Sequence, residues 1–406
     1  MRALGLALSL LTAPLAPEAR AYEAAAPEAR ACEAAAPARP APAAQVLKPV
    51  KPGECKKCRA TGKLPCPEHP KAEVELETPE VLYCNAFMAC AVCSGTGWTV
   101  CPTCKNPDTA AALEQRKQDL AVRKVGLKRF DDGMGREVAK AESAHFVLVW
   151  ELARHKVEKK FLEGHELVHL YLGRLEALYA DYLARLQITE KEFSEKITVL
   201  VWEFVPDQEL ASTKFCGQGG KGPIKLMGRR PSVSLNGHKS EFQNDEALHR
   251  ALIHYVVHLL LSAQAPVEWI GNQKAGWLDE GIAHWFEDRH FGICDTYCFQ
   301  EQNANVDFKG GRFRLNMRQM VVDEKVPPIA EVFEQNIDTL TLPQHAASFS
   351  YVDFLLSRDP PKFNELVKKV KAKVASRDAL KEVFGMSPID FEAQWKAWVL
   401  ATYPTR

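Results

Sequence analysis

The pattern of hydrophobic and polar positions predicts both strands and helices in the second half of the chain. Residues 145–151 (HFVLVWE) and 196–204 (KITVLVWEF) are apolar runs of strand length, rich in β-branched and aromatic side chains. Between them, apolar residues recur every three to four positions and predict a helix with one buried face. That stripe consists of Phe161, Val168, Tyr171, Leu175, Leu178 and Tyr182. Residues 245–262 are mostly apolar and predict a buried helix, so an α+β domain is expected here.

The remaining segments complete the expected organisation. The C-terminal third is expected to be mainly helical and ends in FEAQWKAWVLATYP. Residues 107–142 are charged and helix-prone, which predicts a helical connector. Residues 22–50 are rich in Ala and Pro and hold too few large apolar side chains to bury a core, so they are expected to form a disordered tether. This tether separates residues 1–21 from a cysteine-rich module at residues 51–106, and the α+β domain covers residues 143–406.

The first residues follow the pattern of a secretory signal. Arg2 precedes an apolar run over residues 3–16, and residues 19–21 (ARA) form a small-x-small cleavage site. The run is too short to stay in a bilayer as a span. We therefore expect a signal peptide at residues 1–21 and an exported protein in the periplasm, the cell envelope or the medium. An uncleaved anchor, or a disordered Ala/Leu-rich start, is the alternative. No other segment reaches the length of a membrane span, so no stable span is expected.

Charge and composition narrow the classes of partner. The 52 Lys and Arg residues equal the 52 Asp and Glu residues, so the formal net charge is zero, and no basic run stands out. Binding to nucleic acid depends on a basic surface, so no nucleic-acid partner is expected. A peptide or protein partner is expected instead.

The cysteines are concentrated in one module. Eight of the twelve lie between Cys55 and Cys104. Seven of these, together with His69, form two halves that repeat the same spacing: C-x-x-C, seven residues, then a second pair. A tetrahedral zinc ion takes four nitrogen or sulfur ligands, and one C-x-x-C turn presents two of them. We therefore expect two structural zinc ions. Their eight ligands would be Cys55, Cys58, Cys66, His69, Cys90, Cys93, Cys101 and Cys104.

The turns of this module carry a family resemblance. Residues 93–97 (CSGTG) have both glycines of the C-x-x-C-x-G-x-G pattern, and residues 58–62 (CRATG) have all but the one replaced by Ala60. Such glycines permit the positive φ that the turn requires. Over residues 55–104 the chain resembles the cysteine-rich zinc domain of DnaJ-type co-chaperones, with His69 in place of a cysteine.

This resemblance implies how the ligands share their zinc ions, with the outer pairs around one ion and the inner pairs around the other. The outer pairs are Cys55, Cys58, Cys101 and Cys104. The inner pairs are Cys66, His69, Cys90 and Cys93. The spacing alone also permits each half to close on its own zinc. Two further alternatives stay open: a disulfide-stapled module, which an oxidising compartment favours, and Cys84 as a ligand in place of His69.

The apolar helix at residues 245–262 carries a second candidate site. His254 and His258 are four positions apart, so they share one helix face and can bind one metal ion. Glu280 follows in the segment GWLDEGIAHWFE. This combination resembles the gluzincin, or peptidase MA-like, metallopeptidases over most of residues 145–403. The resemblance implies a zincin-like α+β fold with a helical C-terminal part, and His254, His258 and Glu280 as the ligands of a third zinc.

One departure from that family concerns its chemistry. The general base of these enzymes follows the first histidine, and Tyr255 occupies that position. Tyrosine has a pKa near 10 and is a poor base at neutral pH, and loss of a general base costs about 10²–10⁴-fold in rate. His284 also departs, because related enzymes carry an acidic residue there. We expect a pseudo-peptidase that binds a peptide or protein. An active zinc metallopeptidase and a chaperone-like holdase centred on the zinc module are the alternatives.

A complete H-E-x-x-H motif competes with this site. It runs from His165 to His169, and taken literally it makes Glu166 the general base. The helix continues as LYLGRLEALYADYLARL, which is typical of a packing helix, and no E-G-x-A segment follows. We expect the two histidines to flank the buried stripe, with an active site here as the alternative.

Three cysteines have no matching metal partners in the sequence. They are Cys216, Cys294 and Cys298. Export permits a disulfide between Cys294 and Cys298 or from either to Cys216. Buried thiols are the alternative.

Overall fold

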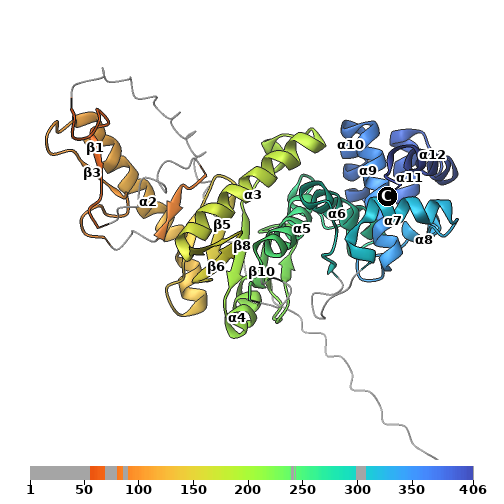
Figure 1. The fold of residues 1–406 in the computed structure, drawn as a ribbon, viewed down its shortest axis with the longest axis horizontal. Coiled ribbons are helices and arrows are strands. Elements are labelled where there is room, and N and C mark those ends of the chain that lie inside the picture. Colours follow the sequence, from red (N-terminus) through yellow and green to blue (C-terminus); the bar gives the residue numbers. More distant parts are fainter. Residues whose placement is uncertain are drawn as a thin grey trace, which may run out of the picture. The chain divides into compact units, whose positions relative to one another are not determined.

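The structure is a computed structural model that describes residues 55–68, 80–85, 90–238, 242, 244–298 and 308–405. The expected signal peptide, the expected tether and the expected ligand His69 lie outside these residues. Within them, a small strand-containing module is followed by mixed helices and strands and then by a helical C-terminal part (Figure 1). This arrangement confirms the α+β class expected from the hydrophobic pattern.

The cysteine-rich module contains little regular structure. Its β1 (Lys63–Pro65) and β3 (Trp98–Val100) pair antiparallel, with Leu64 opposite Thr99. The remainder of its described residues forms turns around the cysteines. A module with so small a hairpin buries little apolar surface, so its stability depends on crosslinks or bound metal.

Six strands form the main sheet, in the order β2-β4-β5-β8-β10-β9. Strands β5, β8 and β10 are parallel to one another, and the other three pair antiparallel with their neighbours. β5 and β8 lie where the apolar runs predict strands. The bounds are β2 Tyr83–Cys84, β4 Lys140–Glu142, β5 Phe146–Trp150, β8 Ile197–Trp202, β9 Ile224–Leu226 and β10 Ser232–Asn236.

Both faces of this sheet are covered by helices, because its side chains alternate between two cores. In β5, Phe146 and Leu148 pack with α3 and α5, whereas Val147 and Val149 pack with α2 and α4. The sheet therefore lies between two helical layers. The bounds of these helices are α2 Pro107–Met134, α3 Gly164–Leu186, α4 Val205–Cys216 and α5 Asp245–Ala263.

The segment expected as a helical connector forms α2 and then joins the sheet. The side chain of Asn106 caps the first turn by accepting two backbone N–H groups, and the helix ends at Gly135 with φ 69°. Residues 140–142 form β4 instead of continuing the helix. In its second half, α2 buries Leu127 and Phe130 against the sheet. This half is thus packed as part of the α+β core.

The helix expected from the apolar stripe is α3, but its first position was wrong. Phe161 lies in β7 (Lys160–Glu163), which forms a hairpin with β6 (Arg154–Val157), and its side chain is 62% exposed. The helix begins at Gly164 because Glu163 and Glu166 form a capping box that satisfies the first backbone N–H groups. The spacing of apolar residues does not show where a helix begins, so the predicted stripe included a residue of the preceding strand. The other stripe residues are buried as expected.

The C-terminal part is helical, as the sequence predicts. α6 packs extensively against both α5 and α9. Gly281 permits the close approach of α9, because a Cβ atom there would lie 2.6 Å from the Ser348 carbonyl oxygen. None of the helices in the described part of the chain has the length and apolar character needed to cross a membrane. The bounds are α6 Gly276–Phe291, α7 Phe313–Val322, α8 Ile329–Val332, α9 Leu342–Arg358, α10 Pro360–Lys371, α11 Ser376–Phe384 and α12 Pro388–Thr402.

Candidate metal centres

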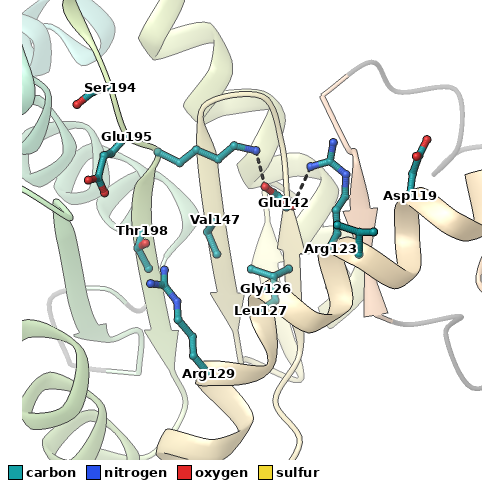
Figure 2. A pocket seen from close by; sticks show the side chains of 12 residues that line it. Asp119, Arg123, Gly126, Leu127, Arg129, Glu142, Val147, Ser194, Glu195 and Thr198 are labelled. Atoms are coloured by element: carbon teal, nitrogen blue, oxygen red, sulfur yellow. Dashed lines mark hydrogen bonds and ion pairs between the residues drawn. The ribbon is translucent and has the colours of Figure 1, made fainter. Parts of the chain in front are cut away.

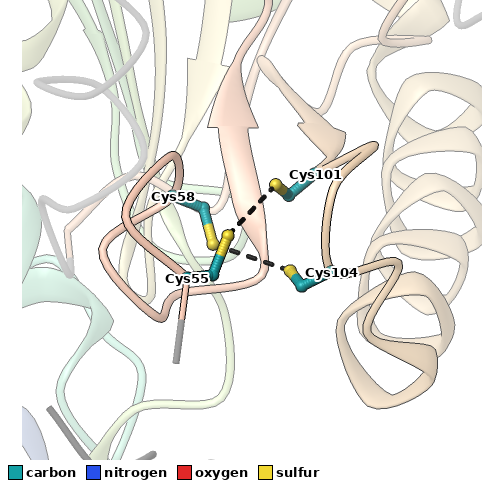
Figure 3. Close-up of side chains that lie close together, drawn as sticks. All are labelled: Cys55, Cys58, Cys101 and Cys104. Carbon is teal, nitrogen blue, oxygen red and sulfur yellow. Dashed lines mark hydrogen bonds between the residues drawn. The ribbon is translucent and has the colours of Figure 1, made fainter. Parts of the chain in front are cut away.

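Four cysteines from the two ends of the module gather around one point (Figure 3). They are Cys55, Cys58, Cys101 and Cys104, and their sulfur atoms all lie within 4.8 Å of one another. Cys55 Sγ is 3.9 Å from Cys101 Sγ, and Cys58 Sγ is 3.6 Å from Cys104 Sγ. Thiolates bound about 2.3 Å from a tetrahedral zinc lie about 3.8 Å apart. The four sulfur atoms therefore fit a zinc ion.

The hairpin of β1 and β3 explains why this site draws on both halves of the module. β1 follows the turn that holds Cys58, and β3 leads into the turn that begins at Cys101. Because the two strands are antiparallel, the start of β1 lies beside the end of β3, and these two turns come together. The backbone N–H of Cys101 donates to Gly62 O (2.8 Å), and that of Cys66 donates to Gly97 O (2.7 Å). The described cysteines thus group by outer and inner pairs. The alternative in which each half closes on its own zinc does not match this geometry.

The two C-x-x-C turns share one backbone conformation. The Thr61 hydroxyl donates to Cys58 O at 2.7 Å, and the Thr96 hydroxyl donates to Cys93 O at 2.8 Å. Ala60 has φ 66°, whereas glycine occupies the equivalent position in the second half. The positive-φ residues are Arg59, Ala60 and Gly62 in one turn and Ser94, Gly95 and Gly97 in the other. The sequence repeat is therefore also a structural repeat.

The protein environment favours the thiolate form at part of the outer site. A backbone N–H donated from Cys104 lowers the pKa of Cys101 to about 6. Partial desolvation of its sulfur and hydrogen bonds with the thiols of Cys58 and Cys101 raise the pKa of Cys104 to about 12. Thiolates are the metal-binding form of cysteine, so metal binding here must displace the thiol protons that remain.

The inner site is described in part. Cys66, Cys90 and Cys93 place their sulfur atoms within 4.8 Å of one another, and the Sγ atoms of Cys66 and Cys90 are 3.8 Å apart. The fourth expected ligand, His69, lies outside the described residues. Cys84 belongs to none of the candidate metal groups in the described part of the chain, because it lies in β2 opposite Ala141. This position does not support Cys84 as the fourth ligand.

A deeply buried set of potential ligands lies between α5 and α6. His254 and His258 are four residues apart on α5, so both rings point toward α6, which contributes Glu280. All three side chains are 0% exposed. The two histidine Nε2 atoms are 3.2 Å apart, and each lies 3.6 Å from an oxygen of Glu280. The structure thus brings together the three residues that the sequence suggests for a third zinc.

The geometry at Glu280 fits a metal ion. Nitrogen and oxygen ligands bound about 2.0–2.1 Å from a tetrahedral zinc lie about 3.3–3.4 Å apart. Among the described residues, neither carboxylate oxygen of Glu280 has a hydrogen-bond partner of good geometry, although the group is fully buried. Burial alone would raise its pKa, but the imidazoles of His284 and His345 hold the pKa of Glu280 well below its usual range. A buried carboxylate in this state is costly unless cations neutralise it, and a zinc ion would do so together with the imidazole of His284.

Two outer carboxylates orient the histidines. His258 Nδ1 lies 2.8 Å from Asp279 Oδ1, and His254 Nδ1 lies 3.2 Å from Glu287 Oε2. A histidine that donates from one ring nitrogen to a carboxylate presents the lone pair of the other nitrogen to a metal. Burial also lowers the pKa of His254 to about 4, so the ring is neutral near pH 7. The sequence interpretation missed Asp279 and Glu287; the signal was their spacing around Glu280 on one helix.

Two further histidines complete what we call the histidine cluster. His284 Nε2 and His345 Nδ1 each lie 3.3 Å from Glu280 Oε2, and His284 Nδ1 lies 3.1 Å from Glu287 Oε2. Burial alone would lower the pKa of His284, but the carboxylates of Glu280 and Glu287 raise this pKa to about 9. The His284 ring is therefore a cation near pH 7. His345 comes from α9 and had no motif to identify it. The cluster comprises His254, His258, Asp279, Glu280, His284, Glu287, Cys298 and His345.

Cys298 is the member of the cluster that sequence reasoning placed wrongly. We expected it to have no metal partners, but its Sγ lies 3.2 Å from His258 Nε2 and 3.5 Å from His254 Nε2. The reason is the chain reversal after α6. Gly292 ends that helix with φ 72°, and the following segment returns across α5. Spacing along the sequence does not reveal such a return.

The disulfides considered for the downstream cysteines are not formed. No disulfide links Cys216, Cys294 and Cys298 in the described part of the chain. Cys294 Sγ donates to the carbonyl of His284 (3.3 Å), and burial raises the pKa of its thiol well above the usual value. Cys216 lies in the other core, with its Sγ 3.7 Å from Ser232 Oγ. These two cysteines are buried thiols.

The complete H-E-x-x-H motif does not assemble a metal site. Within the described residues, neither His165 nor His169 belongs to a group of three potential ligands. Glu166 Oε2 accepts the backbone N–H of Glu163 at 2.9 Å and so caps the first turn of α3. The motif is explained by its place at a helix start.

An open pocket lies elsewhere, between α2 and strands β4, β5 and β8 (Figure 2). Glu142 in this pocket is paired with both Arg123 and Lys196. Its lining residues include neither histidine nor cysteine. Because these charges are already paired with one another and no soft ligand lines the pocket, the candidate metal groups of the described residues lie in the cysteine-rich module and the histidine cluster.

The ligand groups of these two regions are compatible with a metal such as zinc. Comparison with known proteins adds no family to this description, because no protein-family model and no curated protein matches the chain.

Proposed function

We propose that this chain is an exported zinc protein in which a DnaJ-like two-zinc module is joined to a gluzincin-like domain. In this proposal the second domain holds a third zinc but does not hydrolyse peptide bonds, and the protein acts by binding a peptide or protein. The proposal rests on the residues of the two candidate centres.

The observation that carries the proposal is Tyr255, where a peptidase of this kind has its general base. Tyr255 follows the first histidine on α5, and its side chain is buried, with Lys225 Nζ 5.0 Å from the ring centroid. Even with a cation beside it, a tyrosine has a high intrinsic pKa, so its hydroxyl is protonated near pH 7. In that form it accepts a proton poorly. The site therefore lacks the group that activates water in such enzymes.

The burial of the third site also favours a structural role. Its histidines and Glu280 are 0% exposed, whereas a hydrolase must admit both water and a peptide. Zinc bound there would neutralise Glu280 and crosslink α5 to α6, two of the central helices. Metal at this place would therefore stabilise the domain.

The sheet offers a place for an extended peptide. β9 is the outermost strand in the described order and pairs with β10 on one side only. An extended chain can add to such an edge through backbone hydrogen bonds. Lys225 in β9 reaches Cys298 of the histidine cluster (Nζ to Sγ 2.8 Å), so a peptide on this edge would run beside the third site.

The first test combines a zinc count with an assay of hydrolysis on the full chain. We expect three zinc ions per chain, two after His258→Ala, and three after His249→Ala, which alters a histidine on the same helix outside the cluster. We expect no cleavage of an unstructured protein such as casein. Cleavage that disappears in His258→Ala, or in Glu166→Gln, would overturn the pseudo-peptidase proposal. Two zinc ions in the unaltered chain would remove the third site from it.

The second test addresses the peptide. A library of extended peptides is screened against the holoprotein, and hydrogen exchange is measured with the best binder. We expect new protection of the backbone amides of residues 224–226. Protection confined to residues 55–104 would instead favour the holdase alternative centred on the zinc module.

A further inference from the structure

The segment after α6 holds Cys298 against the histidine cluster through a series of polar contacts. The backbone N–H groups of Asp295 and Thr296 donate to Glu287 Oε1 at 2.8 and 3.0 Å. The carboxylate of Asp295 pairs with Arg250 on α5, whose Nε lies 2.6 Å from Oδ1. The backbone N–H of Cys294 donates to Gly311 O at 2.9 Å. The position of Cys298 is therefore built into the fold.

The Sγ atom of Cys298 lies where a fourth ligand of a tetrahedral ion would lie. A thiolate bound about 2.3 Å from zinc and a nitrogen bound about 2.0–2.1 Å from it are about 3.5–3.6 Å apart. The observed separations are 3.5 Å to His254 Nε2 and 3.2 Å to His258 Nε2. With Glu280 included, all four ligand atoms lie within 4.8 Å of one another. Both the number and the spacing of the donors match a complete tetrahedral set.

Charge is consistent with the same arrangement. The ligands would be two neutral imidazoles, the Glu280 carboxylate and a thiolate, so a divalent cation leaves the set neutral. Lys225 Nζ lies 2.8 Å from Cys298 Sγ and would donate to the thiolate. Cys298 as a residue is only 9% exposed, so solvent has little access to displace it.

We propose that the Cys298 thiolate is the fourth protein ligand of the metal held by His254, His258 and Glu280. This inference rests on the third metal site of the proposed function and specifies its chemistry. A hydrolytic zinc site keeps one position for water, whereas a site with four protein ligands is closed. The metal then ties α5, α6 and the segment after α6 into one unit. The thiolate takes the position that a reacting water would need.

The test compares Cys298→Ser with Cys294→Ser in the full chain. Cys294 is a matched control because it lies four residues before Cys298 in the same segment, and its buried thiol donates to the backbone carbonyl of His284. The cysteine-rich module is kept filled with zinc, and one equivalent of Co²⁺ is added. The spectrum of His258→Ala, treated in the same way, is subtracted to remove any cobalt bound at the module. Sulfur-to-cobalt charge-transfer absorption in the remaining spectrum reports a thiolate ligand.

We expect this absorption in the unaltered chain and in Cys294→Ser, and its loss in Cys298→Ser. We also expect Cys298→Ser to hold the third metal more weakly, by at least the ~10–100-fold that loss of an outer-shell partner costs. If cobalt binds and Cys298→Ser leaves both the absorption and the affinity unchanged, Cys298 is not a ligand, although the third site of the proposed function stands. If the unaltered chain takes up no cobalt that depends on His258, both the ligand assignment and the third site fail.

Discussion

The two metal-binding regions of this molecule are built in opposite ways. In the cysteine-rich module the candidate ligands come from short turns around a hairpin of three residue pairs, and one of them, Cys104, is exposed. In the histidine cluster the ligands come from α5, α6, α9 and a returning segment, and the metal-facing groups are almost fully buried. The first region has no core without its metal. The second lies inside a core that other contacts already hold together.

This difference has a consequence for stability. In the module, the free energy of metal binding would be the main contribution to folding. In the cluster, apolar packing of the helices and of the sheet supplies most of the stability, and a bound metal would remove the cost of buried charge. In the proposed zinc protein the same ion would therefore have a folding role in one region and a neutralising role in the other.

The largest expected effect is the response to metal removal. Chelation should unfold the module, because structural zinc contributes on the order of 10–16 kcal/mol in small zinc domains. The sheet and its helices should stay folded. Hydrogen exchange resolved by segment checks this: residues 55–104 should lose protection, and residues 146–202 should keep it.

Single substitutions sharpen this experiment. Cys101→Ser should reproduce the loss of protection in the module, whereas Cys84→Ser, in β2 of the main sheet, should not. If residues 55–104 stay protected after chelation and lose protection only with a reductant, disulfides hold the module instead of zinc.

The two regions also differ in how far the sequence predicts them. The strands β5 and β8 and helix α5 follow from local periodicity, and the cysteine ligands follow from a repeat with fixed spacing. His254, His258 and Glu280 could be named because helix spacing and a familiar segment mark them. These features are all local in sequence.

What the sequence does not predict depends on long-range packing. His345 reaches the cluster because Gly281 lets α9 approach α6, and Cys298 reaches it because the chain reverses at Gly292. Phe161 was assigned wrongly for the converse reason. Its spacing fits the helical stripe, but it lies in a hairpin, and the capping box makes the helix begin after it, at Gly164. Periodicity describes elements and says little about where they begin or what they meet.

The next largest expected effect is a difference between the two regions in how their metal affinity responds to acid. Each proton that metal displaces makes the apparent affinity fall by about tenfold per pH unit below the pKa of the ligand. The outer cysteine site contains Cys104, whose pKa is raised to about 12, so it still carries a proton to displace near pH 7. His254, with its pKa lowered to about 4, stays neutral between pH 8 and pH 6 and has none. Cys298 is the one proposed ligand of the cluster that would bring a thiol proton, whereas the outer site has four cysteines.

We therefore expect the zinc affinity of the module to decrease more steeply from pH 8 to pH 6 than that of the cluster. Competition with a chelator of known pH dependence measures both, with His258→Ala isolating the module. Equal slopes for the two regions would contradict the assigned protonation states.

A smaller effect is expected from the helix contact that supports the cluster. In Gly281→Ala the added Cβ would meet Ser348 O at 2.6 Å and Val352 Cγ2 at 2.7 Å. Overpacking of this kind costs about 1–3 kcal/mol, so thermal unfolding of the α+β domain should shift down by several degrees. The module should be unaffected. Gly173→Ala on α3, where a Cβ meets nothing within 4 Å, should stabilise the chain slightly and serves as the control.

The smallest expected effect tests the structural repeat inside the module. Ala60 and Gly95 occupy equivalent positions, with φ 66° and φ 84°, and this left-handed conformation costs a non-glycine residue about 1–2 kcal/mol. Ala60→Gly should therefore stabilise the module by about 1 kcal/mol, and Gly95→Ala should destabilise it by a similar amount. Exchange rates of the amides in residues 55–68 and 90–104 of the zinc-loaded chain measure both changes. Because the two substitutions are opposite, the double variant should return close to the original stability. If both single variants shift stability in the same direction, the two turns do not share the conformation that relates the halves of the module.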